Sequence, residues 1–101
     1  MENFISKFKI NKNIIKIILT NGKKINPLSL AVIKNLRKEI EFISNQKETK
    51  VIIISSNGPG FSAGHDLAEL KLNHNNKEFY LELFNECSEL MKKILKIPKP
   101  V

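Results

Sequence analysis

The chain has 101 residues, the usual size of one domain and too few for two independent hydrophobic cores. Apolar residues make up 42% and charged residues 27%, which argues against a disordered chain, and no apolar run approaches the roughly 20 residues of a membrane-spanning helix. The net charge of +7 comes almost entirely from lysines scattered along the chain, which is not the clustered, arginine-rich pattern of a protein that reads nucleic acid. We therefore expect residues 1–101 to form one globular domain or a piece of one, with nucleic-acid binding disfavoured and no membrane partner.

The chain begins with two predicted strands. Residues 4–10 alternate apolar and polar side chains, and residues 13–20 are dense in β-branched residues and end at the turn pair Asn21-Gly22. Residues 11–13 suit the turn between them. These patterns predict a β-hairpin.

A helix and a buried strand follow. Asn26 offers an N-cap, Pro27 suits the first helical position, and apolar residues then repeat at helical spacing, which predicts a helix over residues 27–45. Residues 50–55 contain Val-Ile-Ile-Ile without alternation, the pattern of a strand buried on both faces of a parallel sheet. The order predicts a strand, helix, strand unit.

Two more helices complete the chain. Residues 66–72 favour a short helix, and after a polar loop at 73–76 a long helix begins near Lys77. Its apolar residues at helical spacing predict a buried stripe formed by Tyr80, Phe84, Cys87, Met91 and Ile94. Residues 97–101, Ile-Pro-Lys-Pro-Val, stop this helix and lead toward another extended segment, so we expect a truncated domain.

The turn between the buried strand and the short helix carries the chemical signal. It reads Ser-Asn-Gly-Pro-Gly-Phe-Ser-Ala-Gly-His-Asp-Leu over residues 56–67. Its glycines can adopt positive φ and let a ligand approach the backbone. Amide N–H groups at the entrance to a helix lack helical acceptors and lie where the dipole favours negative charge. The turn therefore predicts a site for an anion or an oxyanion.

Two other motifs match the same glycines less well. Residues 60–64 satisfy G-x-S-x-G, but in a nucleophile elbow the serine follows the strand directly, whereas residues 57–60 intervene here. His65 lies too close in sequence to Ser62 to be the usual distant base, and His74 lies in a polar loop where we expect it to be solvated. A dinucleotide fingerprint needs G-x-G-x-x-G, whereas the spacing here is G-x-G-x-x-x-G.

The same segment resembles a known family. The apolar run Val-Ile-Ile-Ile-Ser-Ser at residues 51–56, followed by Gly-Pro-Gly-Phe-Ser-Ala-Gly-His-Asp-Leu-Ala-Glu-Leu at 58–70, is similar to the enoyl-CoA hydratase/isomerase (crotonase) superfamily pattern G-x-x-F-x-A/S-G-x-D-L-x-E-L. Asn-Pro-Leu at 26–28 resembles the family's Asn-Ala-Leu, and Gly-His-Asp-Leu is most similar to the subgroup called enoyl-CoA hydratase domain-containing protein 3. The resemblance covers essentially the whole chain and implies an α/β fold: the N-terminal part of a crotonase-type ββα spiral (ClpP/crotonase-like), incomplete at the C-terminus.

The resemblance also implies the ligand and its site. Family members bind an acyl-CoA thioester and stabilise its enolate with two backbone N–H groups, one of which maps onto His65. The Ala63 carbonyl maps onto the acceptor of the adenine amino group, and Lys23 and Lys24 lie where the family places cations near the CoA phosphates. The remaining expected substrate or CoA contacts are Gly64, Asp66, Leu67, Leu70, Asn26 and Leu28. No separate cofactor is expected, since CoA is part of the substrate.

The implied activity is that of an enoyl-CoA hydratase or isomerase, with the second oxyanion amide and the glutamate acid and base beyond Val101. The alternative is a non-catalytic acyl-CoA-binding or interaction protein, and lysine-mediated RNA binding is a third hypothesis. Asp66 is expected to cap the short helix and Glu69 to face solvent. The family implies a homotrimer or a hexamer for the complete domain.

The remaining residues with chemical potential have simple interpretations. Cys87 is the only cysteine, so no disulfide forms within the chain, and with two histidines it makes no recognisable metal-ligand set. Ser62 is read as a small residue that permits a tight turn. The N-terminus, Met-Glu-Asn-Phe-Ile, shows no targeting signal, and we expect an intracellular protein of the cytoplasm or the mitochondrion.

Overall fold

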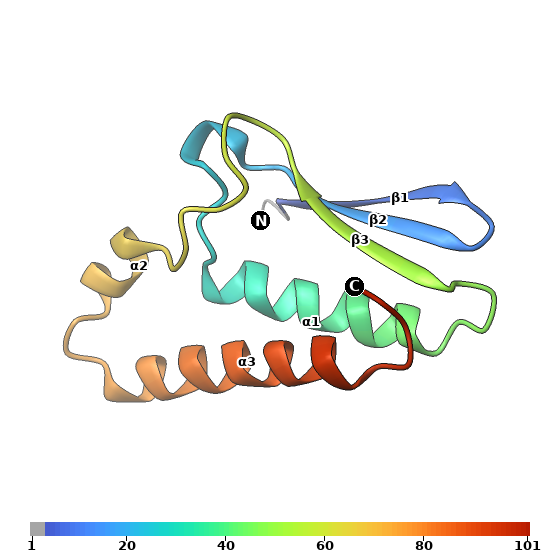
Figure 1. The fold of residues 1–101 in the computed structure, drawn as a ribbon. Helices are drawn as coiled ribbons and strands as arrows, with labels where there is room; N and C mark the ends of the chain where they lie inside the picture. The colour runs from blue at the N-terminus through green and yellow to red at the C-terminus, as the bar shows by residue number, and fades with distance from the viewer. Residues whose placement is uncertain (1–3) are drawn as a thin grey trace.

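A computed structural model describes residues 4–101. The expectation about targeting concerns the N-terminal segment, whose first three residues lie outside this range. The chain forms a three-stranded sheet with α1 beneath it and α3 alongside α1 (Figure 1). The elements in chain order are β1 (Ile5–Asn11), β2 (Ile14–Leu19), the 3-10 turn η1 (Gly22–Lys24), α1 (Leu30–Ser44), β3 (Val51–Ser56), α2 (Leu67–Leu72) and α3 (Lys77–Lys96).

The predicted hairpin is confirmed. β1 pairs antiparallel with β2, with Ile5 opposite Leu19, and a two-residue turn joins them. Along β2 the side chains of Ile15, Ile17 and Leu19 are buried while their neighbours are only half-buried. Successive side chains of a strand point to opposite faces, so β2 directs one apolar row toward α1.

The predicted strand, helix, strand unit is also confirmed, because β3 pairs parallel with β2 across the α1 crossover. The expectation that β3 is buried on both faces is wrong. Ile52 is 1% exposed, whereas Ile53 on the opposite face is 37% exposed. Among residues 4–101 the covering helices lie on one side of the sheet (Figure 1), so only one face of β3 is enclosed.

The start of α1 differs from the prediction. The N-cap is Ser29, whose Oγ accepts a hydrogen bond from the Val32 amide at 3.2 Å, and not Asn26. Ile25 and Asn26 both have positive φ, 56° and 47°, so the backbone turns sharply there before the helix can begin. Pro27 therefore lies in the connection and not in the first helical turn.

The core-facing side of α3 is rotated from the predicted stripe. Leu83 and Leu90 are 1% and 2% exposed, whereas Phe84 and Met91 are about half exposed. Cys87 is half-buried between the two sides. Two apolar rows coexist on α3, and α1 packs on the row that begins at Leu83.

The core lies between the sheet, α1 and α3. Its buried members are Ile15, Ile17, Leu19, Val32, Ile33, Leu36, Ile40, Ile43, Ile52, Leu83 and Leu90. After α3 the chain returns to β3, where the Ile52 amide donates to the Pro100 carbonyl at 3.0 Å, although residues 97–101 form no strand. No helix within the described range is long and apolar enough to cross a membrane.

Candidate functional site at the glycine-rich turn

The turn that follows β3 lies at the carboxyl ends of the two parallel strands. There it meets η1 and the segment that enters α1 (Figure 1). Ligands of open α/β sheets bind in this position, because loops from both strands converge there. The sequence thus placed its chemical motif where the fold favours a site.

Glycines bring the two loops into direct backbone contact. Gly58 has φ +85°, and a Cβ at this position would lie 2.8 Å from the Gly22 Cα. A Cβ on Gly22 would lie 2.6 Å from Asn57 Oδ1. No side chain fits at either residue, so packing requires both glycines, and Gly58 is required by its positive φ as well.

Asn26 fastens the two loops together. It is 3% exposed; its Oδ1 accepts from the Asn21 amide at 2.7 Å, and its Nδ2 donates to the Asn57 carbonyl at 3.3 Å. Its own carbonyl accepts a hydrogen bond from Ser62 Oγ at 2.9 Å. The Asn26 side chain is therefore engaged within the chain and acts on the site through the loops that it holds.

The segment that carries the expected oxyanion amide is pinned by backbone hydrogen bonds. The Ala63 amide donates to the Ile25 carbonyl at 2.7 Å, and the Leu28 amide donates to the Gly64 carbonyl at 2.7 Å. Leu28 and His65 form an isolated parallel bridge. The entry to α1 thus acts as a short strand partner for this segment.

The His65 backbone amide is left open by this arrangement. Within residues 4–101 no acceptor pairs with its N–H. The preceding Gly64 has φ +86°, and a Cβ there would meet nothing within 4 Å. Glycine is thus required for the backbone conformation, and the space beside the backbone is free for a ligand.

The His65 imidazole points elsewhere. Its ring meets the edge of Phe84 on α3, with ring centroids 5.8 Å apart and an interplanar angle of 77°. Its Nδ1 is buried, and the described part of the chain offers it no hydrogen-bond partner. Phe84 is a neighbour of the site that the sequence did not identify, since its spacing indicated the core.

The two carboxylates beside the turn are both engaged. Asp66 caps α2 as predicted, accepting from the Glu69 amide at 3.2 Å. The expectation that Glu69 faces solvent is wrong, because its Oε1 accepts from the Leu30 amide at 2.9 Å. A carboxylate is favoured there by the unpaired N–H groups and the positive end of the α1 dipole.

The other expected contact residues divide into exposed and packed positions. Leu67 is 78% exposed, whereas Leu70 packs against the core cluster. Lys23 and Lys24 are exposed at the end of η1. Lys23 borders an open hollow of about 580 Å³ that is otherwise lined by Phe4, Thr20, Asn21, Gly22, Asn57, Gly58 and Pro59.

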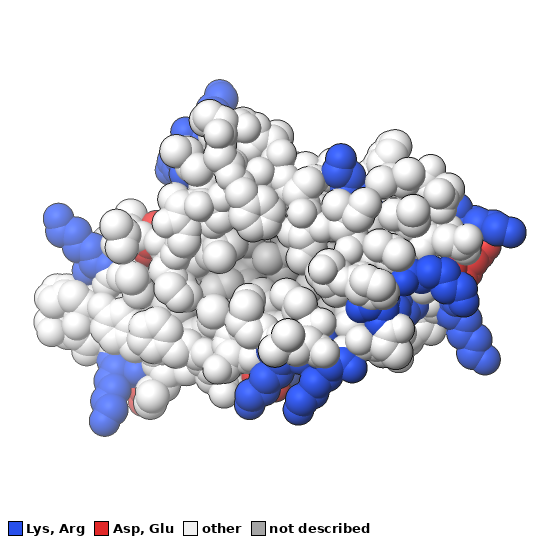
Figure 2. Space-filling model, viewed as in Figure 1, with Lys and Arg blue, Asp and Glu red and all other residues white. Residues whose placement is uncertain are grey.

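A small apolar cavity of about 130 Å³ lies under the turn, between the sheet, α1 and α3. Its lining is entirely hydrophobic: Leu19, Leu28, Leu36, Ile54, Phe61, Leu90, Met91 and Ile94. In the view of Figure 2, the described side chains between β3, the turn and α3 are mostly uncharged, and the Lys and Arg side chains lie toward the edges of the molecule. The sequence did not predict this cavity, because its walls come from six separate segments: β2, the entry to α1, α1, β3, the turn and α3.

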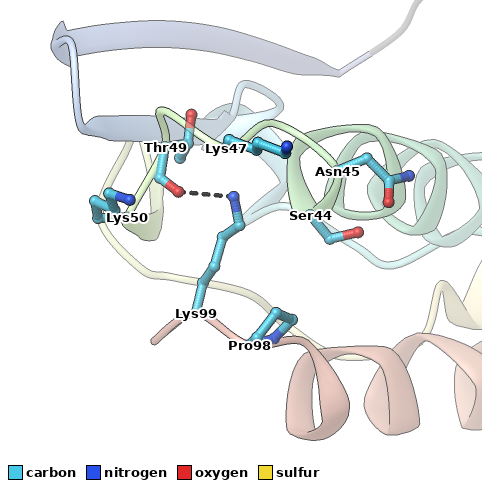
Figure 3. Close-up of a pocket in the computed structure, with 7 residues that line it drawn as sticks. All are labelled: Ser44, Asn45, Lys47, Thr49, Lys50, Pro98 and Lys99. Carbon is cyan, nitrogen blue, oxygen red and sulfur yellow. Dashed lines mark hydrogen bonds between the residues drawn. The ribbon is translucent and has the colours of Figure 1, made fainter.

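A second hollow lies at the opposite end of the sheet, before β3 (Figure 3). It has a volume of about 420 Å³ and is lined by Ser44, Asn45, Lys47, Thr49, Lys50, Pro98 and Lys99. Lys99 Nζ donates to the Thr49 carbonyl at 2.7 Å and also to the Gln46 carbonyl. This lysine joins the C-terminal segment to the loop before β3, so the polar groups here serve the fold.

The remaining candidates are structural. Ser62 Oγ donates to the Asn26 carbonyl and accepts from the Gly64 amide at 3.0 Å, so it organises the turn and is not set up as a nucleophile. His74 is exposed in its loop, with Nδ1 near the Lys71 carbonyl. The part of the chain that the structure describes contains no group of three metal-ligating side chains.

Comparison with known proteins defines the class to which this fold and turn belong. The family model described as Enoyl-CoA hydratase/isomerase matches residues 9–101. The chain belongs to the enoyl-CoA hydratase/isomerase family. Its fold is the α/β architecture of the N-terminal part of the crotonase fold, as predicted.

Within that family the similarity points to one subgroup. Mitochondrial enoyl-CoA hydratase domain-containing protein 3 of Homo sapiens is 45% identical over 85 residues, which are 84% of this chain and 28% of that protein. The Xenopus laevis protein of the same name is 41% identical over 86 residues, 85% of this chain and 29% of that protein. The subgroup that Gly-His-Asp-Leu indicated is confirmed.

Solved structures give the same result. The crystal structure of human enoyl-CoA hydratase domain-containing protein 3 matches with a TM-score of 0.88 and 41% identity over 97% of this chain. Enoyl-CoA hydratase of Mycobacterium smegmatis matches with a TM-score of 0.91 and 25% identity over 99% of this chain. In both cases the match covers 38% of the other chain. The chain thus spans well under half the length of the proteins that it matches.

Proposed function

We propose that the protein binds an acyl-CoA thioester at the turn over residues 57–66 and polarises the thioester carbonyl with the backbone N–H of His65. The observation that carries the proposal is this unpaired N–H, held beside the open backbone of Gly64 at the carboxyl ends of β2 and β3. A preorganised donor of this kind stabilises the charge that develops on an enolate oxygen and lowers the barrier by several kcal/mol.

The proposed activity is of the hydratase or isomerase type, because an enolate is the common intermediate of those reactions. The His65 amide supplies one donor to the oxyanion. Asp66 and Glu69 are occupied in hydrogen bonds to backbone amides, so neither acts as the general acid or base. The contribution of this part of the protein is substrate binding and carbonyl polarisation.

The surroundings of the turn suit the two ends of such a ligand. Lys23 beside the polar hollow provides a cation for the CoA phosphates. The apolar cavity of about 130 Å³ suits a hydrocarbon group, since a cavity of about 150 Å³ lined by similar side chains holds benzene. We assign a short acyl chain to this cavity.

CoA binding tests the proposal through the melting temperature of the protein. A ligand that binds only the folded state stabilises it, by about 2.7 kcal/mol at a concentration of 100 times Kd. CoA should raise the melting temperature of the wild type, and Gly64→Val should abolish the rise, because the new side chain occupies the open space beside His65 and disfavours φ +86°. Ala68→Val places the same isopropyl side chain at an exposed position of α2 and should keep the rise.

A non-catalytic acyl-CoA-binding or interaction protein is the second candidate function, favoured by the engagement of both nearby carboxylates. The two candidates differ in the fate of the protons next to the thioester carbonyl. An enolate-forming enzyme exchanges them with deuterium from the solvent, whereas a binding protein leaves them in place. Exchange that depends on the protein, measured by mass spectrometry of the recovered acyl-CoA, supports the enzyme.

The surface of the protein bears on its oligomeric state. We propose a homotrimer or hexamer, supported by large apolar side chains on the surface such as Phe61 and Leu95, which are 55% and 83% exposed. A monomeric mass in light scattering contradicts this oligomeric state.

The matched curated relatives are mitochondrial by name. We place this protein in the mitochondrion or the cytoplasm, and cell fractionation tests this placement.

A further inference from the structure

Aromatic side chains on α3 connect it to both ends of the segment that carries the oxyanion amide. The ring centroids of Phe84 and His65 lie 5.8 Å apart. Tyr80 stacks on Phe84 with ring centroids 6.3 Å apart and an interplanar angle of 13°. The Tyr80 hydroxyl donates to the Leu70 carbonyl at 2.8 Å. The two neighbouring aromatic residues thus hold the segment at residue 65 and at residue 70.

The other anchors of this segment lie mainly at the entry to α1. The Ala63 amide donates to the Ile25 carbonyl, the Leu28 amide donates to the Gly64 carbonyl and the Leu30 amide donates to Glu69 Oε1. Beyond these bonds α2 is weakly held, because none of its six residues is buried and only Leu70 packs against the core cluster. A helix this short is not stable by itself, so its position depends on such contacts.

The packing of α3 indicates that this pair is not needed for the core. Leu83 and Leu90 fill the core, whereas Phe84 is 53% exposed. The His65 Nδ1 has no hydrogen-bond partner among residues 4–101, so no hydrogen bond to this atom fixes the ring. Its edge-to-face contact with Phe84 therefore contributes to the orientation of the ring, and such pairs are attractive beyond simple burial.

We infer that Tyr80 and Phe84 are positioning residues of the acyl-CoA site. The direction of the His65 backbone N–H is set by the hydrogen bond from the Leu28 amide to the Gly64 carbonyl, which belongs to the same planar peptide unit, and Tyr80 and Phe84 maintain it by holding Leu70 and the His65 ring. The inference rests on the proposed function, in which this N–H meets the thioester carbonyl. A small error in the direction of a donor weakens its interaction with the carbonyl while leaving contacts to distant parts of the ligand intact.

The test compares two ligands that share the CoA portion. Affinities for CoA and for acetoacetyl-CoA, whose enolate is followed by its ultraviolet absorbance, are measured for the wild type, Tyr80→Phe, Phe84→Leu and Phe84→Tyr. Tyr80→Phe should weaken acetoacetyl-CoA binding about fivefold, the size expected for one net hydrogen bond, and reduce the enolate band, with little change for CoA. Phe84→Leu should act in the same direction, and Phe84→Tyr, which keeps the ring, should retain the wild-type values.

Phe42→Leu on α1 is the matched control, since Phe42 is exposed to a similar degree, 58%, and belongs to another face. It should leave both affinities unchanged. The inference would be overturned if Tyr80→Phe and Phe84→Leu bound acetoacetyl-CoA as tightly as the wild type. An equal loss of affinity for both ligands, accompanied by a lower melting temperature, would also overturn it. Absence of CoA binding by the wild type would instead overturn the proposed function itself.

Discussion

At the scale of single residues, Asn26 shows how a local conformation supports a distant group. Asparagine tolerates the left-handed region better than most residues, and at φ 47° its side chain reaches both Asn21 and Asn57. The sequence predicted a helix cap here, because Asn-Pro is a common helix start. That prediction failed because the decisive partner, the Asn57 carbonyl, is 31 residues away.

Replacing Asn26 separates the role of its side-chain hydrogen bonds from the role of its positive-φ backbone. Asn26→Ala removes two hydrogen bonds, leaves the Asn21 amide and the Asn57 carbonyl unpaired and places alanine at positive φ; we expect a loss of about 2 kcal/mol in the free energy of unfolding. Asn26→Gly restores the backbone freedom and should cost less. Urea unfolding measures both, with Asn45→Ala as a control, because the Asn45 side chain bonds only to the exposed end of α1. An unfolding free energy of Asn26→Ala equal to that of the control contradicts this role.

At the scale of elements, α1 and α3 run parallel and are joined by ion pairs along their length. Lys34 pairs with Glu82 at 2.9 Å and Arg37 pairs with Glu86 at 2.8 Å. The hydrogen bond to Glu82 raises the pKa of Lys34 above its usual value of 10.5, with burial acting in the opposite direction. The pairs connect the helix after β2 to the helix whose aromatic residues hold the turn.

The Lys34 pair predicts a pH dependence of stability. Because the pKa of Lys34 is higher in the folded chain, its contribution is complete below the unfolded value of 10.5 and is lost as the pH rises through the higher folded value. Lys34→Met should therefore lower the melting temperature at neutral pH, and the difference from the wild type should shrink above pH 10.5. Thermal unfolding at several pH values measures it; a constant difference contradicts the prediction. Salt should weaken the effect at neutral pH, since the pair is partly exposed.

The predictability of the elements depended on how local their signals are. The β-branched run of β2 and the helical spacing of apolar residues in α3 identified those elements correctly, since both signals lie within the element itself. The core-facing side of α3 was misassigned, because Phe84 and Leu83 both belong to apolar rows at helical spacing and only the packing on α1 selects one.

At the scale of the whole molecule, the sequence located the turn because its glycines and its family pattern are contiguous. The sequence did not predict the long-range features of the site, which are the contact of Phe84 with His65, the hydrogen bond from the Leu30 amide to Glu69, and the apolar cavity. Each depends on residues brought together by the fold from separate segments. Residue types indicated the place of the candidate site, and tertiary packing determined which of its polar groups remain unpaired.

The most direct test of the central claim follows the His65 backbone amide during titration with an acyl-CoA, using ¹⁵N-labelled protein and NMR. A hydrogen bond to the thioester oxygen should move the His65 amide proton downfield and slow its exchange with solvent, with smaller changes at Ala63 and Gly64. The residues of the opposite hollow, such as Lys47 and Lys99, should not respond. An unchanged His65 amide in a protein saturated with acyl-CoA, or changes confined to the opposite hollow, would contradict the assignment of the glycine-rich turn as the acyl-CoA site.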